Sequence, residues 1–76
     1  MGIWVRSQNK ARLSVCNDFD IYTILNEDTP YVVSANNRDF GYYETLERAN
    51  RVLDEIQNFI YNDSFDEYCI FDMPAE

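Results

Sequence analysis

Trp4 and Arg6 are the residues whose types and spacing most clearly suggest chemistry in this sequence. In an extended strand they share one face and lie about 7 Å apart. An indole can stack on a planar base, and a guanidinium can hold a phosphate through two hydrogen bonds. Nearby cationic and amide side chains would strengthen such a site. The candidate ligand-binding residues are therefore Trp4, Arg6, Gln8, Lys10 and Arg12.

Trp4 also allows a structural interpretation, in which the indole belongs to a core beneath a helix while Ile3 and Val5 face elsewhere. The 6 tyrosines raise a similar question. They are either partly exposed residues of a sheet, or they line an oligomer interface or a ligand pocket, where one end of the ring is apolar and the other is wet. The sequence leaves both questions open.

Several kinds of catalysis are excluded by the residues that are missing. The chain has no histidine, so a Ser-His or Cys-His pair cannot form within it. Glycine occurs only at positions 2 and 41, which rules out the glycine-rich phosphate-binding loops. The acids Asp63, Asp66 and Glu67 do not have the spacing of a calcium-binding EF-hand loop. We expect a binding protein rather than an enzyme, without a metal or a cofactor.

The charge of the chain is strongly acidic and unevenly distributed. It has 14 acidic and 6 basic residues, a formal net charge of -8, which disfavours general binding to nucleic acids or to anionic membranes. Residues 1–16 carry three cations and no acid, whereas residues 52–76 carry acids and no base. This gradient is compatible with solubility and attraction between the two ends, with a local anion site, or with an acidic face for a basic partner.

The length of 76 residues predicts a single domain over residues 1–76. No secretory signal is recognisable, and no apolar stretch approaches the roughly 18 residues that a membrane span needs. Cys16 and Cys69 do not form a C-x-x-C pair. We expect both to be reduced, small apolar residues of a cytoplasmic protein.

Alternation with a period of two predicts a series of short strands separated by turns. A turn rich in Asn, Asp and Pro spans residues 26–30, and a second turn spans residues 36–39. The expected strands cover residues 3–7, 19–25, 31–35, 40–43 and 68–73, and residues 13–16 could form a further short strand.

One amphipathic helix of about 16 residues is expected after Thr45, an acceptable N-cap. Leu53 and Ile56 should lie at the centre of its contact with the sheet. Glu47, Arg51 and Glu55 are spaced for ion pairs on the opposite side. The apolar stripe consists of Leu46, Ala49, Val52, Leu53, Ile56, Phe59 and Ile60.

Together these elements predict an α+β fold of order β-β-β-β-α-β. The expected sheet is small, antiparallel or mixed, with four to five strands and the helix packed on one face.

The sequence resembles a family of small proteins from phages and mobile elements of Gram-positive bacteria. Residues 3–8 read Ile-Trp-Val-Arg-Ser-Gln, like the opening of that family. Residues 40–49 and 52–57 resemble its helix motif, Leu-Gly-x-Tyr-x-Thr-x-Glu-Arg-Ala followed by Val-Leu-x-Glu-Ile-Gln. Residues 71–74, Phe-Asp-Met-Pro, resemble its Tyr-x-Met-Pro ending. Residues 13–39 match only loosely.

The resemblance implies a phage protein of the host bacterial cytoplasm, a class in which antagonists of host defence are frequent. In the first hypothesis the chain is a homo-oligomeric sponge that sequesters a nucleotide-derived immune signalling molecule. In the second it is an acidic inhibitor that mimics nucleic acid and blocks a host defence nuclease such as a CRISPR effector. The expected partner is thus a small molecule or a host defence protein, and neither nucleic acid nor a membrane. The first is favoured because Trp4 and Arg6 lie in the matching motif, whereas the acids of residues 63–67 lie outside it.

Overall fold

A computed structural model describes residues 2–25, 28–63 and 69–76 of the chain. This part contains six strands and one helix, so the predicted α+β class is confirmed. The predicted order needs one correction, because five strands rather than four precede the helix. The elements are β1 (Ile3–Arg6), β2 (Leu13–Cys16), β3 (Phe19–Thr23), β4 (Tyr31–Ala35), β5 (Arg38–Tyr43), α1 (Leu46–Asp63) and β6 (Ile70–Asp72).

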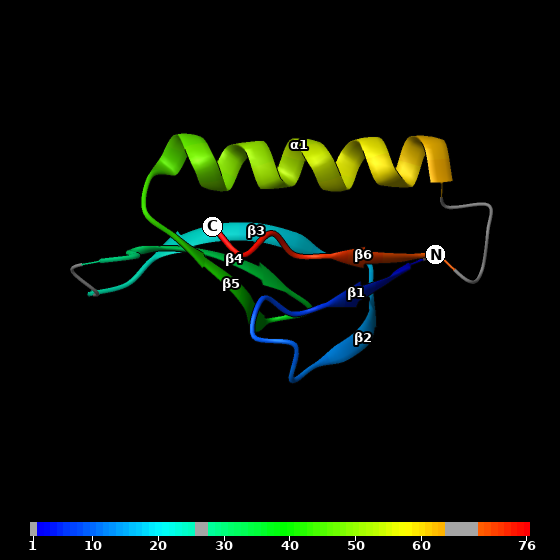
Figure 1. Ribbon diagram of the computed structural model, residues 1–76, viewed down its shortest axis with the longest axis horizontal. Helices are drawn as coiled ribbons and strands as arrows, with labels where there is room; N and C mark the ends of the chain where they lie inside the picture. Colours follow the sequence, from blue (N-terminus) through cyan, green and yellow to red (C-terminus); the bar gives the residue numbers. More distant parts are fainter. Residues whose placement is uncertain (1, 26–27, 64–68) are drawn as a thin grey trace.

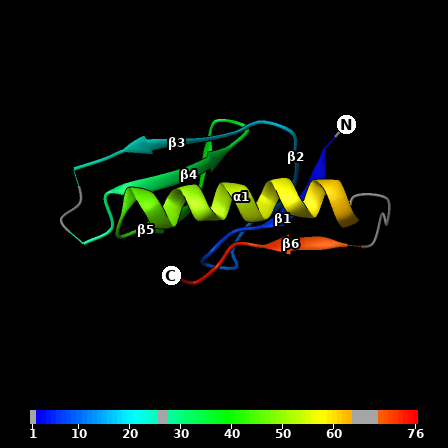
Figure 2. The same ribbon diagram turned by 90° about the horizontal axis from the view of Figure 1, so that it is seen from above.

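The strands form two three-stranded sheets rather than one. Sheet A is mixed, with the order β2-β1-β6, and β1 runs parallel to β6 and antiparallel to β2. Sheet B is an antiparallel meander of order β3-β4-β5. Helix α1 lies along one side of both sheets (Figures 1 and 2). We call the sheet faces turned toward α1 inner and the opposite faces outer.

The helix begins where the sequence predicts, but it buries a narrower stripe. The Thr45 hydroxyl caps the first turn by accepting a hydrogen bond of 3.0 Å from the Arg48 backbone N–H. Ile56 is buried and Leu53 only partly so, while the stripe residues Leu46 and Ile60 are exposed. These two lie in the end turns of α1, beyond its central contact with the sheets.

The ion pairs predicted for the side of α1 opposite its apolar stripe also differ from those observed. Arg48, rather than Arg51, pairs with Glu55, at 3.1 Å. Arg48 is two turns before Glu55, so the two side chains lie on the same side of the helix.

The core fills the space between α1 and the inner faces of both sheets. The inner residues Ile3 and Val5 of β1 are buried, and Phe71 of β6 meets Phe59 of α1 edge to face at 5.5 Å between ring centres. The alternative that placed Trp4 beneath the helix is therefore wrong. Trp4 lies on the outer face because neighbouring residues of a strand point to opposite sides.

A tight turn and a bulge shape the β4–β5 hairpin. The predicted four-residue turn is reduced to Asn36 and Asn37, which have positive φ angles of 52° and 64°, typical of a two-residue hairpin turn. Strand β5 therefore starts at Arg38, two residues earlier than predicted. Phe40 is an extra residue, since Ser34 pairs with Asp39 and Val33 with Gly41. A bulge of this kind shifts the alternation of the strand.

Other strand ends also differ from the expectations. Strand β3 ends at Thr23 rather than at residue 25, and β1 ends at Arg6. Of the predicted last strand, β6 covers Ile70–Asp72, whereas residue 68 lies outside the described residues. No helix in the described ranges has both the length and the apolar character that crossing a membrane requires.

Candidate functional site

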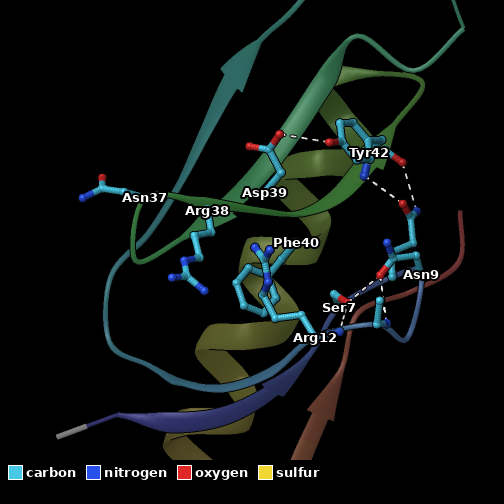
Figure 3. A pocket seen from close by; sticks show the side chains of 10 residues that line it. Ser7, Asn9, Arg12, Asn37, Arg38, Asp39, Phe40 and Tyr42 are labelled. Atoms are coloured by element: carbon cyan, nitrogen blue, oxygen red, sulfur yellow. Dashed lines mark hydrogen bonds between the residues drawn. The ribbon is translucent and has the colours of Figure 1, made fainter.

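A cavity of about 500 Å³ opens between the β1–β2 loop and the β4–β5 hairpin. Figure 3 shows its lining side chains, with α1 behind them. The residues come from two segments that are distant in sequence and combine two arginines with amides and aromatic rings. They are Ser7, Gln8, Asn9, Ala11, Arg12, Asn37, Arg38, Asp39, Phe40 and Tyr42.

The β1–β2 loop fixes the position of Arg12 through a small hydrogen-bond network. The Ser7 hydroxyl donates to Asn9 Oδ1 at 2.7 Å and accepts from the Arg12 backbone N–H at 3.0 Å. The Asn9 side chain also accepts from the Ala11 N–H at 3.0 Å. Lys10 adopts a positive φ of 67°, which lets the chain reverse direction here. The polar residues of this loop thus hold Arg12 at the edge of the cavity.

The β4–β5 turn brings Arg38 to the same cavity. Asn36 connects this turn to β2 and to the link between β2 and β3: its side chain donates to Val15 O at 2.9 Å, and its backbone N–H donates to Asp18 O at 2.9 Å. Because Arg38 follows the turn directly, its backbone is anchored at a fixed place. In Figure 3 the side chains of Arg12 and Arg38 both lie beside Phe40.

Both arginines leave their charge available to a ligand. The Arg12 guanidinium carbon lies 5.8 Å from the centre of the Phe40 ring, a cation–π arrangement that orients the side chain and satisfies none of its N–H donors. Within residues 2–25, 28–63 and 69–76, neither Arg12 nor Arg38 forms an ion pair with a carboxylate. Two such guanidiniums beside one cavity can bind an anion with several oxygen atoms, such as a phosphate.

The carboxylate of the cavity, Asp39, is held by two tyrosines. The Tyr42 hydroxyl donates to it at 2.9 Å, and the Tyr22 hydroxyl donates to its other oxygen. The bulge at Phe40 makes this possible, because it places Asp39 and Tyr42 on the same outer face of sheet B. Their rings flank Val32, which is completely buried. The cluster of Tyr22, Asp39 and Tyr42 is therefore a fixed wall of the cavity.

The hydrogen bonds to Asp39 also change the acidity of the phenols. The bond to the carboxylate raises the pKa of Tyr22 to about 12, since a tyrosinate would be repelled by the negative charge. The same bond raises the pKa of Tyr42, while the nearby positive charge of Arg12 acts in the opposite direction. Both hydroxyls thus remain neutral donors at neutral pH.

The structure divides the five residues predicted as a binding site into two groups. Gln8 and Arg12 line the cavity. Trp4 and Arg6 share the outer face of sheet A, as predicted from their spacing, but they are not part of the cavity lining. Lys10 is not part of the cavity lining either and pairs with Asp72 at 3.6 Å. That Trp4 stacks on a base stays a prediction, and it concerns a surface other than the cavity.

Besides lining the cavity, the Gln8 side chain connects distant parts of the fold by hydrogen bonds. Its side-chain oxygen accepts from the Tyr42 backbone N–H at 2.9 Å. Its amide nitrogen donates to three carbonyl oxygens, at 3.0 Å to Tyr42, 3.2 Å to Pro74 and 2.8 Å to Ala75. One side chain thus joins sheet B and the C-terminal segment to the end of β1. The Lys10–Asp72 pair agrees with the predicted attraction between the oppositely charged ends of the chain, whereas the Gln8 contacts join uncharged groups.

Sequence reasoning misses all five lining residues of the β4–β5 hairpin, which are Asn37, Arg38, Asp39, Phe40 and Tyr42. The sequence predicts a turn at residues 36–39 and a strand leading to the helix at residues 40–43, and neither pattern signals a ligand. The pair Asn36-Asn37 is a signal for a two-residue hairpin, and it would have placed Arg38 at the start of a strand. Among the described residues, no three His, Cys, Asp or Glu side chains come together as a metal site.

Comparison of the chain with models of protein families, with curated proteins and with solved structures finds no match in any of the three.

The raised phenol pKa values predict a loss of stability at alkaline pH. Burial raises the pKa of Tyr43 to about 12, and in the unfolded chain a tyrosine has a pKa of about 10. The neutral phenol is favoured by the folded state, so this contribution is complete below about pH 10 and is lost as the pH rises from about 10 to about 12. Denaturant midpoints measured across this range should fall.

A Tyr43→Phe variant is the control for this alkaline effect. The variant loses the 2.9 Å hydrogen bond from the Tyr43 hydroxyl to Pro74 O, so it should be less stable than the parent near neutral pH. It also lacks the buried phenol, so its midpoint should decline less between about pH 10 and pH 12. Equal declines in the two proteins would show that Tyr43 does not carry the effect.

Proposed function

We propose that this protein binds a small phosphorylated ligand of nucleotide type in the cavity between the β1–β2 loop and the β4–β5 hairpin. The observation that carries the proposal is that Arg12 and Arg38, neither paired with a carboxylate of the described chain, lie beside the same cavity. In a chain of net charge -8, such a local pair of cations is a site where an anion is attracted rather than repelled. Guanidinium groups match phosphate oxygens in geometry as well as in charge.

The size and lining of the cavity support a nucleotide-type ligand over a bare phosphate. Its volume of about 500 Å³ is within the range typical of small-molecule sites. Tyr42 provides a partly exposed aromatic ring, and Asn9 and Asn37 provide amide groups for hydrogen bonds. A phosphate at the arginines would leave room for a ribose or a base against Tyr42.

The chemistry of the lining supports binding without turnover. The lining residues include no cysteine, and the chain has no histidine. The carboxylate of Asp39 is occupied by two phenol hydroxyls, which makes it a poor general base. Together with the resemblance to small phage proteins, this favours a homo-oligomeric sponge that sequesters a nucleotide-derived immune signal in the bacterial cytoplasm.

The proposal is tested by identifying what the protein retains. The purified protein is incubated with extracts that contain signals made by TIR-domain or cyclase enzymes and is then washed and heated. Released molecules are identified by mass spectrometry, and ADP-ribose and a cyclic dinucleotide are titrated as defined probes by calorimetry. We expect an intact nucleotide-type molecule to be released.

Arginine variants then locate the site. A charge-assisted hydrogen bond contributes about 1.5–3 kcal/mol, so Arg12→Ala and Arg38→Ala should each weaken binding about tenfold or more. Arg51→Ala is the matched control, since Arg51 is exposed on α1 and its removal changes the net charge equally. If no nucleotide-type molecule is retained, or if Arg51→Ala weakens binding as much as the other two variants, the proposed site is wrong.

The alternative, an acidic inhibitor of a defence nuclease, finds less support in the described part of the chain. Of the acids expected to form its face, Glu55 pairs with Arg48 and Asp72 pairs with Lys10. The side chains of residues 63–67 lie outside the described residues. Capture of a basic nuclease through residues 52–76, without any retained nucleotide, would favour this alternative.

A further inference from the structure

The outer face of sheet A carries an apolar row that crosses all three strands. Val15 of β2, Trp4 of β1 and Ile70 of β6 are in register with one another. Their exposed fractions are 47%, 42% and 45%. We call these three residues the apolar row. On the same face, the exposed Leu13 extends it at the edge of the sheet.

The outer face of sheet B provides an internal comparison. There the polar side chains bind one another: Tyr22 and Tyr42 donate to Asp39, and Ser34 donates to Asp20. The same rings cover Val32 completely. This face is closed by its own side chains, whereas the apolar row of sheet A is covered by nothing in the described part of the chain.

The strands of sheet A have the sequence pattern of a sheet that is buried on both faces. An antiparallel sheet with one solvated face alternates apolar and polar residues, whereas a doubly covered sheet is apolar on both sides. Strand β1 reads Ile-Trp-Val and β6 begins Ile-Phe, so residues of both faces are apolar. The inner residues meet the core, and the outer ones are suited to a second covering layer.

The charges around the apolar row indicate what this layer is. Lys10 pairs with Asp72 at 3.6 Å, and Arg6 Nε donates to the Lys10 carbonyl at 2.9 Å, a bond that leaves the positive charge of Arg6 in place. Arg6 and Asp72 are in register on adjacent strands, so this end of the face carries both signs of charge and is complementary to the same face of a second copy. Asp72 is the only acid among the described residues of this sheet, so two copies of a chain with net charge -8 can meet here without bringing acids together.

We infer that the apolar row is the interface of a symmetric homodimer, in which the outer faces of two A sheets pack on each other. A two-fold contact uses the same patch on both copies, so the Trp4 ring of each copy is covered by the partner's sheet. The two cationic cavities are not part of this contact, because the row and the cavity share no residue. The inference is therefore independent of the proposed ligand.

The test uses Trp4 as its own reporter, since it is the only tryptophan in the chain. Sedimentation of the intact protein at tens of micromolar should give twice the monomer mass of 9.0 kDa. On dilution, the emission maximum of Trp4 should move to longer wavelength in parallel with dissociation, as the indole becomes exposed to water.

Two variants locate the interface without removing the reporter. Val15→Lys and Ile70→Lys each place a charge in the apolar row and should raise the dissociation constant at least tenfold, and both should stay folded by circular dichroism because these residues lie on edge strands. Tyr61→Lys is the matched control, with an 80% exposed apolar residue on α1 and the same change of charge, and it should dimerise like the parent.

Three results would overturn the inference. The first is a parent protein that stays monomeric up to hundreds of micromolar. The second is association that leaves the Trp4 emission unchanged. The third is association that survives both row variants when they are folded, or that is lost in Tyr61→Lys.

Discussion

Replacing Ile56 by alanine will lower the free energy of unfolding by about 2–5 kcal/mol. Ile56 is 2% exposed and packs in the core between α1 and the sheets. Removing its side chain loses apolar burial and leaves a cavity that the surrounding strands can only partly fill. Because small domains have a total stability of about 5–15 kcal/mol, this one change removes a large fraction of it.

The matched control is Ile60→Ala, one turn further along the same helix. Ile60 is 42% exposed, so its replacement removes the same atoms from a position that is already partly exposed to solvent. Urea unfolding followed by circular dichroism should give a clearly smaller loss, and Leu53→Ala should lie between the two because Leu53 is partly buried. Equal midpoints for Ile56→Ala and Ile60→Ala would contradict the observed packing of α1.

The second large effect is expected for Gln8→Glu, which should cost about 2–3 kcal/mol at neutral pH. The amide nitrogen of Gln8 donates to the carbonyl oxygens of Tyr42, Pro74 and Ala75. A carboxylate at this place would turn a donor into a negative acceptor facing three other acceptors. The links from β1 to β5 and to the C-terminal segment would then loosen together.

The same substitution at an exposed position separates this effect from that of added charge. Gln57 is exposed on α1, so Gln57→Glu changes the net charge identically without facing carbonyl groups. The difference in stability between the two variants should shrink as the pH falls toward about 4, because a protonated carboxyl can again donate a hydrogen bond. A difference that is absent at neutral pH would show that the Gln8 contacts contribute little.

The sequence was sufficient for the local features of the fold. The position of α1 followed from its 3.6-residue periodicity and from Thr45, and the strands followed from their alternation. The division into two sheets was not predictable in this way, because it depends on the parallel pairing of β1 with β6, which are separated by most of the chain. Local patterns carry no information on which distant strands become neighbours.

Only part of the candidate site was predictable, because local patterns again do not show which distant segments of the chain meet. Arg12 and Gln8 are predictable because they lie in the N-terminal segment together with other polar and cationic residues. Arg38 and Tyr42 lie beside these residues only because the β1–β2 hairpin contacts the β4–β5 hairpin. The hydrogen bonds between Gln8 and Tyr42 stabilise this contact. The bulge at Phe40 could not be foreseen either, since it is a property of the pairing of β5 with β4.

The topology also determines the order in which the molecule can be completed during its synthesis. Sheet B is built from consecutive strands and can pair as soon as it leaves the ribosome, because its contacts are local. Strand β1 is synthesised first, but it can pair with β6 only after nearly the whole chain has been synthesised. The hydrogen bond between Gln8 and Pro74 likewise joins residues 66 positions apart. Until residues 70–75 emerge, the β1–β2 hairpin has apolar side chains uncovered on both faces. A chain that is released before residue 70 has been added is thus exposed to proteases and to aggregation, even though its helix and its second sheet can already be in place.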